Sequence, residues 1–403
     1  MLAGCNQQPS SESSPVVSLH SELGGSAEGF QRACEPIALS FPKDHAAHPA
    51  FRNEWWYFTG NVESESASGK RFGFHVTFFR VATKADKTLL DKTDQTVTAL
   101  QASTENQQPA ALDSAWAANQ FYMGHFAITE SDASAVIAHE RFARAAAGLA
   151  GAETKTESDD LQIWIDDWSI VHKQSDPTDF KTSIWQLSLS TDDDFLELSL
   201  QAQKPVVEQG DSGYSQKSSD PCNSSYYYSI PRLQVAGTIG RDGAQHKVAG
   251  SAWLDREWSS SALADDQTGW DWFALQLDDG TDIMVYHLRK QDGTIDPHSY
   301  AVAMDPNGVK TLLTLPELSI DRWWKSATGA RYPVEGQLTF NSAKNTDTNT
   351  TMNAAATPRT IRFTPLIDNQ ELNLTVRYWE GAIRLSDESG SAIGQGYLEL
   401  TGY

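Results

Sequence analysis

Acidic side chains set among tryptophans are the residues of this chain whose types and spacing could do chemistry. Glu257 precedes Trp258, and Asp271 lies between Trp270 and Trp272. Burial in apolar surroundings favours the neutral form of a carboxylic acid and raises its pKa, so such a group can donate a proton near neutral pH. Indole faces beside it would stabilise a cation formed on a substrate. The alternative is structural: each carboxylate pairs with an arginine, and each tryptophan fills a core.

The alternation of side chains along a strand sorts these residues onto faces. Residues i and i+2 share a face, so Asp255 and Glu257 are expected on one face, opposite Arg256 and Trp258. By the same rule, Asp271 faces away from the two tryptophans that flank it. A local salt-bridge cluster of Asp255, Arg256 and Glu257 is also consistent with the pattern. The structural and the catalytic interpretations both stay open on these residues alone.

Motifs for other chemistries are absent or incomplete. Residues 210–213 read Gly-Asp-Ser-Gly, like the surroundings of a trypsin-type nucleophile. No histidine stands in the matching setting upstream, so a β-turn is the better interpretation. The chain has no Gly-x-Ser-x-Gly elbow, phosphate loop, dinucleotide fingerprint or zinc-ligand spacing. His45 and His48 lack a third ligand at a recognisable spacing, which favours turn and capping roles. We therefore expect neither a metal nor a cofactor.

Composition narrows the class of protein. The 403 residues are enough for two domains. They include 13 Trp, 12 Tyr and 16 Phe, an aromatic load that suits large buried faces or an apolar cavity. The net charge of -22 repels phosphate backbones, so nucleic acid is not an expected partner. The same charge disfavours unaided binding to an anionic membrane surface.

The beginning of the chain predicts an export and anchoring signal. Leu-Ala-Gly-Cys, ending at Cys5, resembles the cleavage box of bacterial lipoproteins, and residues 1–29 have the composition of a flexible tether. The alternative is a chance tetrapeptide. A lipidated Cys5 would hold the protein at the periplasmic side of the bacterial cell envelope, and we expect the anchoring membrane to be the outer membrane. In that oxidising compartment Cys34 and Cys222 could pair, although the sequence does not show that they do.

Many short strands, separated by Gly, Pro, Asn and Asp, predict an all-β fold of sandwich or barrel type. An aromatic strand, a turn and a strand that ends in arginine occur twice, at residues 54–80 and 269–289. This repeat indicates two related β modules. We place the domains at residues 30–230 and 231–403, after the tether at 1–29.

Long aromatic motifs between residue 41 and the C-terminus resemble the carotenoid hydratase and attachment-protein H (lipocalin-like) family. These motifs are Glu54–Asn61 with Gly73–Arg80, Tyr226–Leu233, Trp253–Trp258, Gly269–Trp272, Tyr378–Gly381 and Gly396–Tyr403. The resemblance implies two successive lipocalin- or streptavidin-like β-barrels. Enzymes of this family add water to an isolated double bond of an acyclic isoprenoid. As aligned here, a His-x-Trp and a Tyr-x-Asp carry that activity.

At the matching positions this chain reads Arg256-Glu257-Trp258 and Tyr286-His287-Leu288, so the Trp and the Tyr are kept and the His and the Asp are not. Glu257, Asp271 or His287 could substitute. Our expectation is a lipid-anchored protein that binds an apolar molecule or a lipid between or within its barrels. The alternative is an acid-catalysed hydratase, lyase or isomerase, and a hydrolase is a third. The expected residues are catalytic Glu257, Asp271, Tyr286 and His287, and ligand-binding Trp253, Trp258, Trp270 and Trp272.

Overall fold

A computed structural model describes residues 26–66, 69–85, 118–156, 158–261, 263–340 and 359–403. Cys5 and most of the predicted tether lie outside these ranges. The described chain is built from antiparallel strands that form two sheets, with only two short 3-10 turns, η1 (Lys43–His45) and η2 (Phe180–Thr182). Within the described ranges, no helix has the length and hydropathy that crossing a membrane requires.

The first sheet has 13 strands, and its main path runs β4-β3-β2-β1-β13-β12-β9-β8-β7-β6-β5. Its strands are β1 (Asn53–Ser64), β2 (Arg71–Ala82), β3 (Gln120–Glu130), β4 (Ile137–Arg144), β5 (Ala150–Thr154), β6 (Leu161–Ile165), β7 (Trp168–Gln174), β8 (Ser183–Ser190), β9 (Phe195–Ala202), β10 (Val207–Glu208), β11 (Tyr214–Gln216), β12 (Ser224–Arg241) and β13 (Ala244–Ser259). It curls around a core that includes Trp56, Phe58, Trp168 and Trp185, all fully buried.

The second sheet has ten strands, with a main path β17-β16-β15-β14-β23-β22-β20-β19-β18. Its strands are β14 (Gln267–Leu277), β15 (Asp282–Lys290), β16 (Tyr300–Met304), β17 (Lys310–Leu312), β18 (Glu317–Lys325), β19 (Arg331–Phe340), β20 (Arg359–Pro365), β21 (Glu371–Asn373), β22 (Arg377–Ser386) and β23 (Ala392–Leu400). They enclose a separate core around Phe273, Phe363 and Trp379. The predicted all-β fold of two successive barrels is confirmed.

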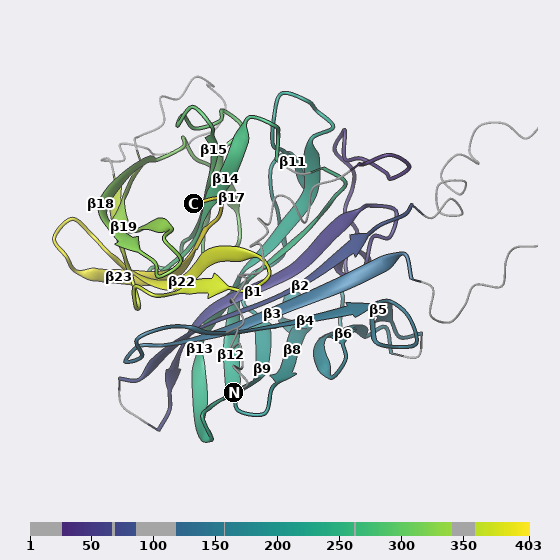
Figure 1. Cartoon of the computed structure of the whole chain (residues 1–403), viewed down its shortest axis with the longest axis horizontal. Helices are drawn as coiled ribbons and strands as arrows, with labels where there is room; N and C mark the ends of the chain where they lie inside the picture. The colour runs from purple at the N-terminus through teal and green to yellow at the C-terminus, as the bar shows by residue number, and fades with distance from the viewer. Residues whose placement is uncertain (1–25, 67–68, 86–117, 157, 262, 341–358) are drawn as a thin grey trace, which may run out of the picture.

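The two barrels pack against each other through their outer faces. Strands β1 and β2 of the first sheet lie against β22 and β23 of the second, as the purple and yellow ribbons in Figure 1 show. Strand β12 passes through the domain boundary that we predicted between residues 230 and 231. Because β12 and β13 both pair within the first sheet, the chain changes sheets between Ser259 and Gln267.

The repeated motif forms equivalent hairpins, β1–β2 and β14–β15. In the first, Glu54 pairs with Arg80 inside its barrel; in the second, Asp271 pairs with Arg289 at 3.0 Å. Each hairpin therefore places a carboxylate on its first strand and an arginine on its second. The repeated motif in the sequence reflects this shared arrangement of a carboxylate and an arginine.

Glu54 is fully buried and binds two guanidinium groups at once, those of Arg80 and Arg256. The backbone N–H of His48 also donates to its carboxylate. Burial alone would raise the pKa of Glu54, but the two arginines hold it well below its usual range. This cluster connects the chain before β1 to strands β1, β2 and β13.

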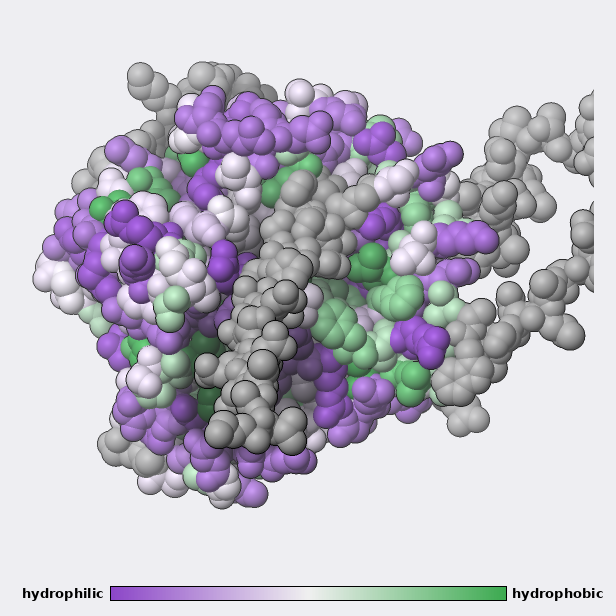
Figure 2. All heavy atoms as spheres, viewed as in Figure 1, coloured by the Kyte–Doolittle hydropathy of each residue, from purple (hydrophilic) through white to green (hydrophobic). Residues whose placement is uncertain are grey.

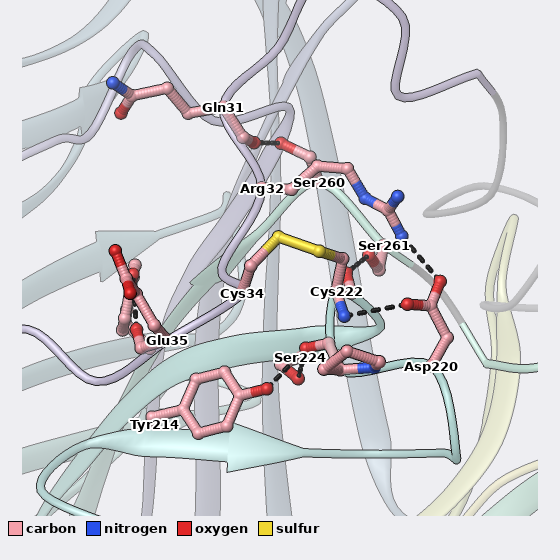
Figure 3. The surroundings of a disulfide bond; sticks show 12 residues. Gln31, Arg32, Cys34, Glu35, Tyr214, Asp220, Cys222, Ser224, Ser260 and Ser261 are labelled. Carbon is pink, nitrogen blue, oxygen red and sulfur yellow. Dashed lines mark hydrogen bonds and ion pairs between the residues drawn. A yellow bond between two sulfur atoms is a disulfide. The ribbon is translucent and has the colours of Figure 1, made fainter. Parts of the chain in front are cut away.

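The Cys34–Cys222 pair forms a disulfide, one of the two alternatives left open by the sequence. Figure 3 shows that it joins the segment before β1 to the loop before β12. Around it, Arg32 pairs with Asp220 at 2.9 Å, and the hydroxyl of Ser261 donates to the carbonyl of Cys222 at 2.8 Å.

The surface visible in Figure 2 is mostly hydrophilic, with hydrophobic residues in separate groups.

Replacement of the buried acid tests the role of the ion cluster. We expect Glu54→Gln to lower the free energy of unfolding by about 3–5 kcal/mol, because two buried guanidiniums lose their counter-charge. Urea denaturation followed by tryptophan fluorescence measures the change. Glu63→Gln is the matched control: the Glu63 side chain is 62% exposed and pairs with Arg71, so its effect should be below about 1 kcal/mol. An equal effect of the two substitutions would contradict the role of Glu54 as the counter-charge of the two buried arginines.

Removal of the disulfide tests its contribution in the same assay. The double variant Cys34→Ser with Cys222→Ser should lower the free energy of unfolding by about 2–5 kcal/mol, because the bond restricts the unfolded chain over a long loop. The two cysteines are separated by 188 positions in the sequence, so the loop that the bond closes is long. Chemical reduction of the wild-type protein should give the same shift, whereas Cys5→Ser should give none. Equal stability with and without the bond would refute this role.

Candidate functional site

A cavity of about 120 Å³ lies between the two barrels. Its volume is several times what a single water molecule needs. One wall comes from β1, β2, β12 and β13, and the other from β14, β15, β22 and β23; we call it the intersheet cavity. Its aromatic lining residues are Trp55, Tyr57, Phe79, Tyr227, Trp270, Trp272, Tyr286 and Tyr378. Asp255, Glu257, Glu399, Lys217 and His75 bring charged or titratable groups into this apolar surface.

The alternation of side chains along β13 explains why acids face the cavity. Asp255 and Glu257 line it, while Arg256 and Trp258 point into the first barrel. The register sets Trp55 of β1 opposite Glu257, which brings an indole beside the carboxylate. The predicted division of β13 into these two faces is confirmed.

Asp255 is the most tightly held acid of the cavity. Its carboxylate accepts hydrogen bonds from the Tyr227 hydroxyl at 2.5 Å, the Ser229 hydroxyl at 2.5 Å and the Trp253 indole N–H at 2.6 Å. Burial raises the pKa of Asp255 to about 7, and the three donors oppose that rise. A carboxyl group with this pKa exists in both protonation states near neutral pH, so it can donate and recover a proton.

Glu380 and Glu399 form a second acidic centre. They lie directly opposite each other on β22 and β23. Burial raises the pKa of Glu399 to about 8, opposed by a hydrogen bond from the Trp270 side chain. Burial and the neighbouring Glu399 raise the pKa of Glu380 well above its usual range, and the Tyr57 hydroxyl donates to it. Two adjacent buried carboxyls cannot both ionise without strong repulsion, so this pair holds at least one proton at neutral pH.

Lys217 supplies the positive charge of the cavity lining. Its ammonium is 3.3 Å from the Glu257 carboxylate and donates to the Ser215 hydroxyl at 2.9 Å. The ammonium also lies 4.6 Å from the centre of the Tyr286 ring. Burial alone would lower the pKa of Lys217, but Glu257 and Tyr286 together raise it. The lysine is therefore protonated and is already paired with Glu257.

Three polar atoms of the lining have no hydrogen-bond partner among the described residues: His75 Nδ1, Asn223 Oδ1 and Ser225 Oγ. Buried polar atoms are normally paired, so each such atom in a cavity marks a place where a polar group of a ligand or a water can bind. Burial and the nearby His125 hold the pKa of His75 well below its usual range, so His75 is neutral. The site therefore combines apolar walls with a few polar anchoring points.

Half of the residues that we proposed from the sequence line this cavity. Glu257, Tyr286, Trp270 and Trp272 do so. Trp253 lies just behind the lining and donates to Asp255.

The other three lie outside the lining, in the barrel interiors. Trp258 stacks on His48 inside the first barrel, with 3.8 Å between ring centroids. Asp271 accepts hydrogen bonds from Arg289 at 3.0 Å and from the Tyr403 hydroxyl at 2.8 Å. His287 Nε2 is 3.2 Å from the carbonyl of Pro316. In their strands, all three point to the face opposite that of the cavity residues, so none of them lies in the lining beside Glu257.

Sequence reasoning missed three functional candidates. Asp255 was placed on the same face as Glu257 by its i+2 spacing but was not named as a catalytic residue. Glu399 carries a comparable signal, since it lies two residues after Tyr397 and between two leucines. Lys217 follows β11 in a polar loop, where nothing in the local sequence indicates a buried charge.

The AttH-like family model matches residues 32–403. The crystal structure of an AttH-like protein from Nitrosomonas europaea has 31% sequence identity and a TM-score of 0.71, and the match covers 93% of this chain and all of that one. A search of curated protein sequences finds no match.

Two further structures share the fold at lower identity. Kievitone hydratase from Nectria haematococca has 13% identity and a TM-score of 0.58, with 93% of this chain and 98% of that chain covered. CghA in complex with Sch210972 has 12% identity and a TM-score of 0.54, with 94% and 97% covered. At these identities the likeness shows the fold alone. The match of the family model over nearly the whole described chain shows that this protein belongs to the AttH-like family.

Proposed function

We propose that this protein binds a mainly apolar small molecule in the intersheet cavity and transfers a proton to it from Asp255. The reaction class is acid-catalysed hydration, or its reverse, or isomerisation of an isoprenoid-like or lipid alkene. The observation that carries the proposal is a buried carboxyl group, with a pKa of about 7, set among aromatic walls. Protonation of an alkene requires such an acid together with shielding of the cation that forms.

The steps follow from the contacts of Asp255. Its O–H proton moves to one alkene carbon, where a C–H bond forms as the π bond breaks, and the neighbouring carbon becomes cationic. Tyr227, Ser229 and Trp253 donate hydrogen bonds that stabilise the resulting carboxylate. The aromatic faces of the cavity stabilise the cation. In hydration, water then adds to the cation and its extra proton returns to Asp255, so the acid is regenerated.

One of the proteins with the same fold is named as a hydratase, kievitone hydratase, and this name supports hydration as the proposed reaction. Glu257 is held by Lys217 and is therefore best suited to orient a polar group or a water. Tyr286, whose hydroxyl is 3.1 Å from that of Ser215, lines the cavity beside Lys217.

Binding without turnover is the second candidate. Leu288 lines the cavity at the position where the resemblance places the aspartate of the hydratases, so one expected acid is replaced by an apolar side chain. That change favours a carrier of an apolar molecule or lipid. In either case we propose a protein of the bacterial cell envelope, held on its periplasmic side by a lipidated Cys5. The Cys34–Cys222 disulfide supports an oxidising compartment.

Substitution of the proposed acid tests catalysis. Protein is incubated in heavy-oxygen water with acyclic isoprenoid alkenes, from geraniol to lycopene, and with kievitone, and mass spectrometry detects alcohols that carry the heavy isotope. For any alkene that reacts, Asp255→Asn should lower kcat/KM by about 10²–10⁴-fold, because the amide cannot protonate carbon. Binding, followed by tryptophan fluorescence, should persist.

Asp271→Asn is the matched control, because Asp271 is a buried carboxylate on the face of β14 that points away from the cavity. It should keep the wild-type rate. Full activity of Asp255→Asn would rule out the proposed acid. A molecule that binds tightly while no alkene reacts would favour the second candidate.

The pH profile of a reactive alkene gives a separate test. Because the protonated form of Asp255 is the donor, kcat/KM should be constant at low pH and fall as pH rises through the pKa of about 7. The fall should approach tenfold per pH unit at higher pH. Stopped assays across this range measure it, with circular dichroism at each pH as a check on folding. A rate that rises with pH would show that Asp255 acts as a base instead.

A further inference from the structure

Three carboxyl groups of the described chain lack a positively charged partner: two that line the intersheet cavity, Asp255 and Glu399, and Glu380, which lies opposite Glu399. Asp255, Glu380 and Glu399 form no ion pair with any described residue, and each is at least nine-tenths buried. Glu257 differs from them, because Lys217 pairs with it. An uncompensated buried carboxylate is costly, so each of these acids either holds a proton or waits for an external cation.

The other basic groups near the cavity cannot serve these acids. Arg256 and Arg289 belong to strands that line it, but they point into the barrels and pair with Glu54 and Asp271. Burial holds the pKa of His75 well below its usual range and that of His125 at about 3, so both rings are neutral. Within the described chain, therefore, no cation pairs with Asp255, Glu380 or Glu399.

The tyrosines that face the acids do not change the net charge around them. Burial raises the pKa values of Tyr57, Tyr227, Tyr378 and Tyr397. Their hydroxyls stay protonated at neutral pH and add no charge. They can still donate hydrogen bonds, as Tyr227 does to Asp255.

The aromatic lining already accepts one ammonium group. Lys217 Nζ lies 4.6 Å from the ring centre of Tyr286 and 5.2 Å from that of Tyr227, both within the range of a cation–π contact. Trp55, Trp270 and Trp272 also line the same space. Recognition of an alkylammonium group commonly uses such a combination of aromatic faces and nearby carboxylates.

We propose that the intersheet cavity is a receptor for apolar organic cations, namely amines or quaternary ammonium compounds with a hydrocarbon body, which it holds by Asp255, Glu399 and the surrounding aromatic rings. The inference rests on the proposed function, because it uses the same cavity, but it requires no bond to be made or broken. A bound cation favours the ionised carboxyls and so releases protons from them.

Three small probes of similar shape test the proposal: phenyltrimethylammonium, the neutral tert-butylbenzene and the anionic 4-tert-butylbenzoate. Binding to the whole protein is followed by tryptophan fluorescence and calorimetry at about 0.15 M salt, where exposed charges are screened and buried ones much less so. The cation should bind about tenfold or more tighter than tert-butylbenzene, and the benzoate weakest.

Proton linkage gives a readout that general attraction to an acidic protein would not produce. Calorimetry near pH 7 in two buffers of different ionisation enthalpy should show net proton release with the cation and none with tert-butylbenzene. Affinity for the cation should rise with pH and level off above about 8, because Asp255 and Glu399 titrate near 7 and 8 in the free protein.

Variants assign the effect to the cavity. Asp255→Asn and Glu399→Gln should each weaken the cation about tenfold and leave tert-butylbenzene unchanged, which also shows that the variant is folded. Asp242→Asn is the control, because the Asp242 side chain is 79% exposed, and it should change neither probe. Equal affinities for cation and neutral probe, or an unchanged preference in both cavity variants, overturns the inference and leaves the proposed function standing. Binding of neither probe overturns both.

Discussion

The salt bridge between Glu54 and Arg256 is the interaction on which the site depends. Both groups are fully buried in the first barrel, and they join strands β1 and β13 from the same side. Because side chains alternate along a strand, Arg256 can point inward only if Asp255 and Glu257 point outward. The outward face of β13 is the one that the second barrel covers. A stabilising ion pair in one core therefore sets the direction of two acids in the neighbouring cavity.

Burial of those acids is a cost that a merely structural interface would avoid. Where the two sheets do bury charges elsewhere, the charges are paired: Asp282 near Met304 binds both Lys204 and Arg232. Instead the contact region contains Asp255, Glu380 and Glu399 without basic partners. Features of this kind, which oppose stability and converge on one cavity, are typical of functional sites. The pKa values that result place the acids where proton transfer is possible at neutral pH.

Most of the fold and part of the site could be predicted from sequence. The repeated hairpin was visible because aromatic strand, turn and arginine recur, and the facing of β13 followed from its alternation. The same alternation placed Asp271 on the face opposite Trp270 and Trp272, as the structure has it. Which face borders the cavity could not be predicted, because both faces of β14 are buried. Lys217 and Glu399 come from distant segments that only the packing of two barrels brings together.

The protonation state of Asp255 tests the central claim most directly. Carbon-13 NMR of protein with labelled aspartate carboxyls, titrated with pH, reports each group, and the Asp255→Asn variant assigns the relevant signal. The account predicts one aspartate that titrates near pH 7, the value set by its burial, and that is missing from the variant. Titration of Asp255 near the ordinary aspartate value of 3.8 would contradict it, because the carboxyl would then be ionised at neutral pH and could not serve as the proton donor.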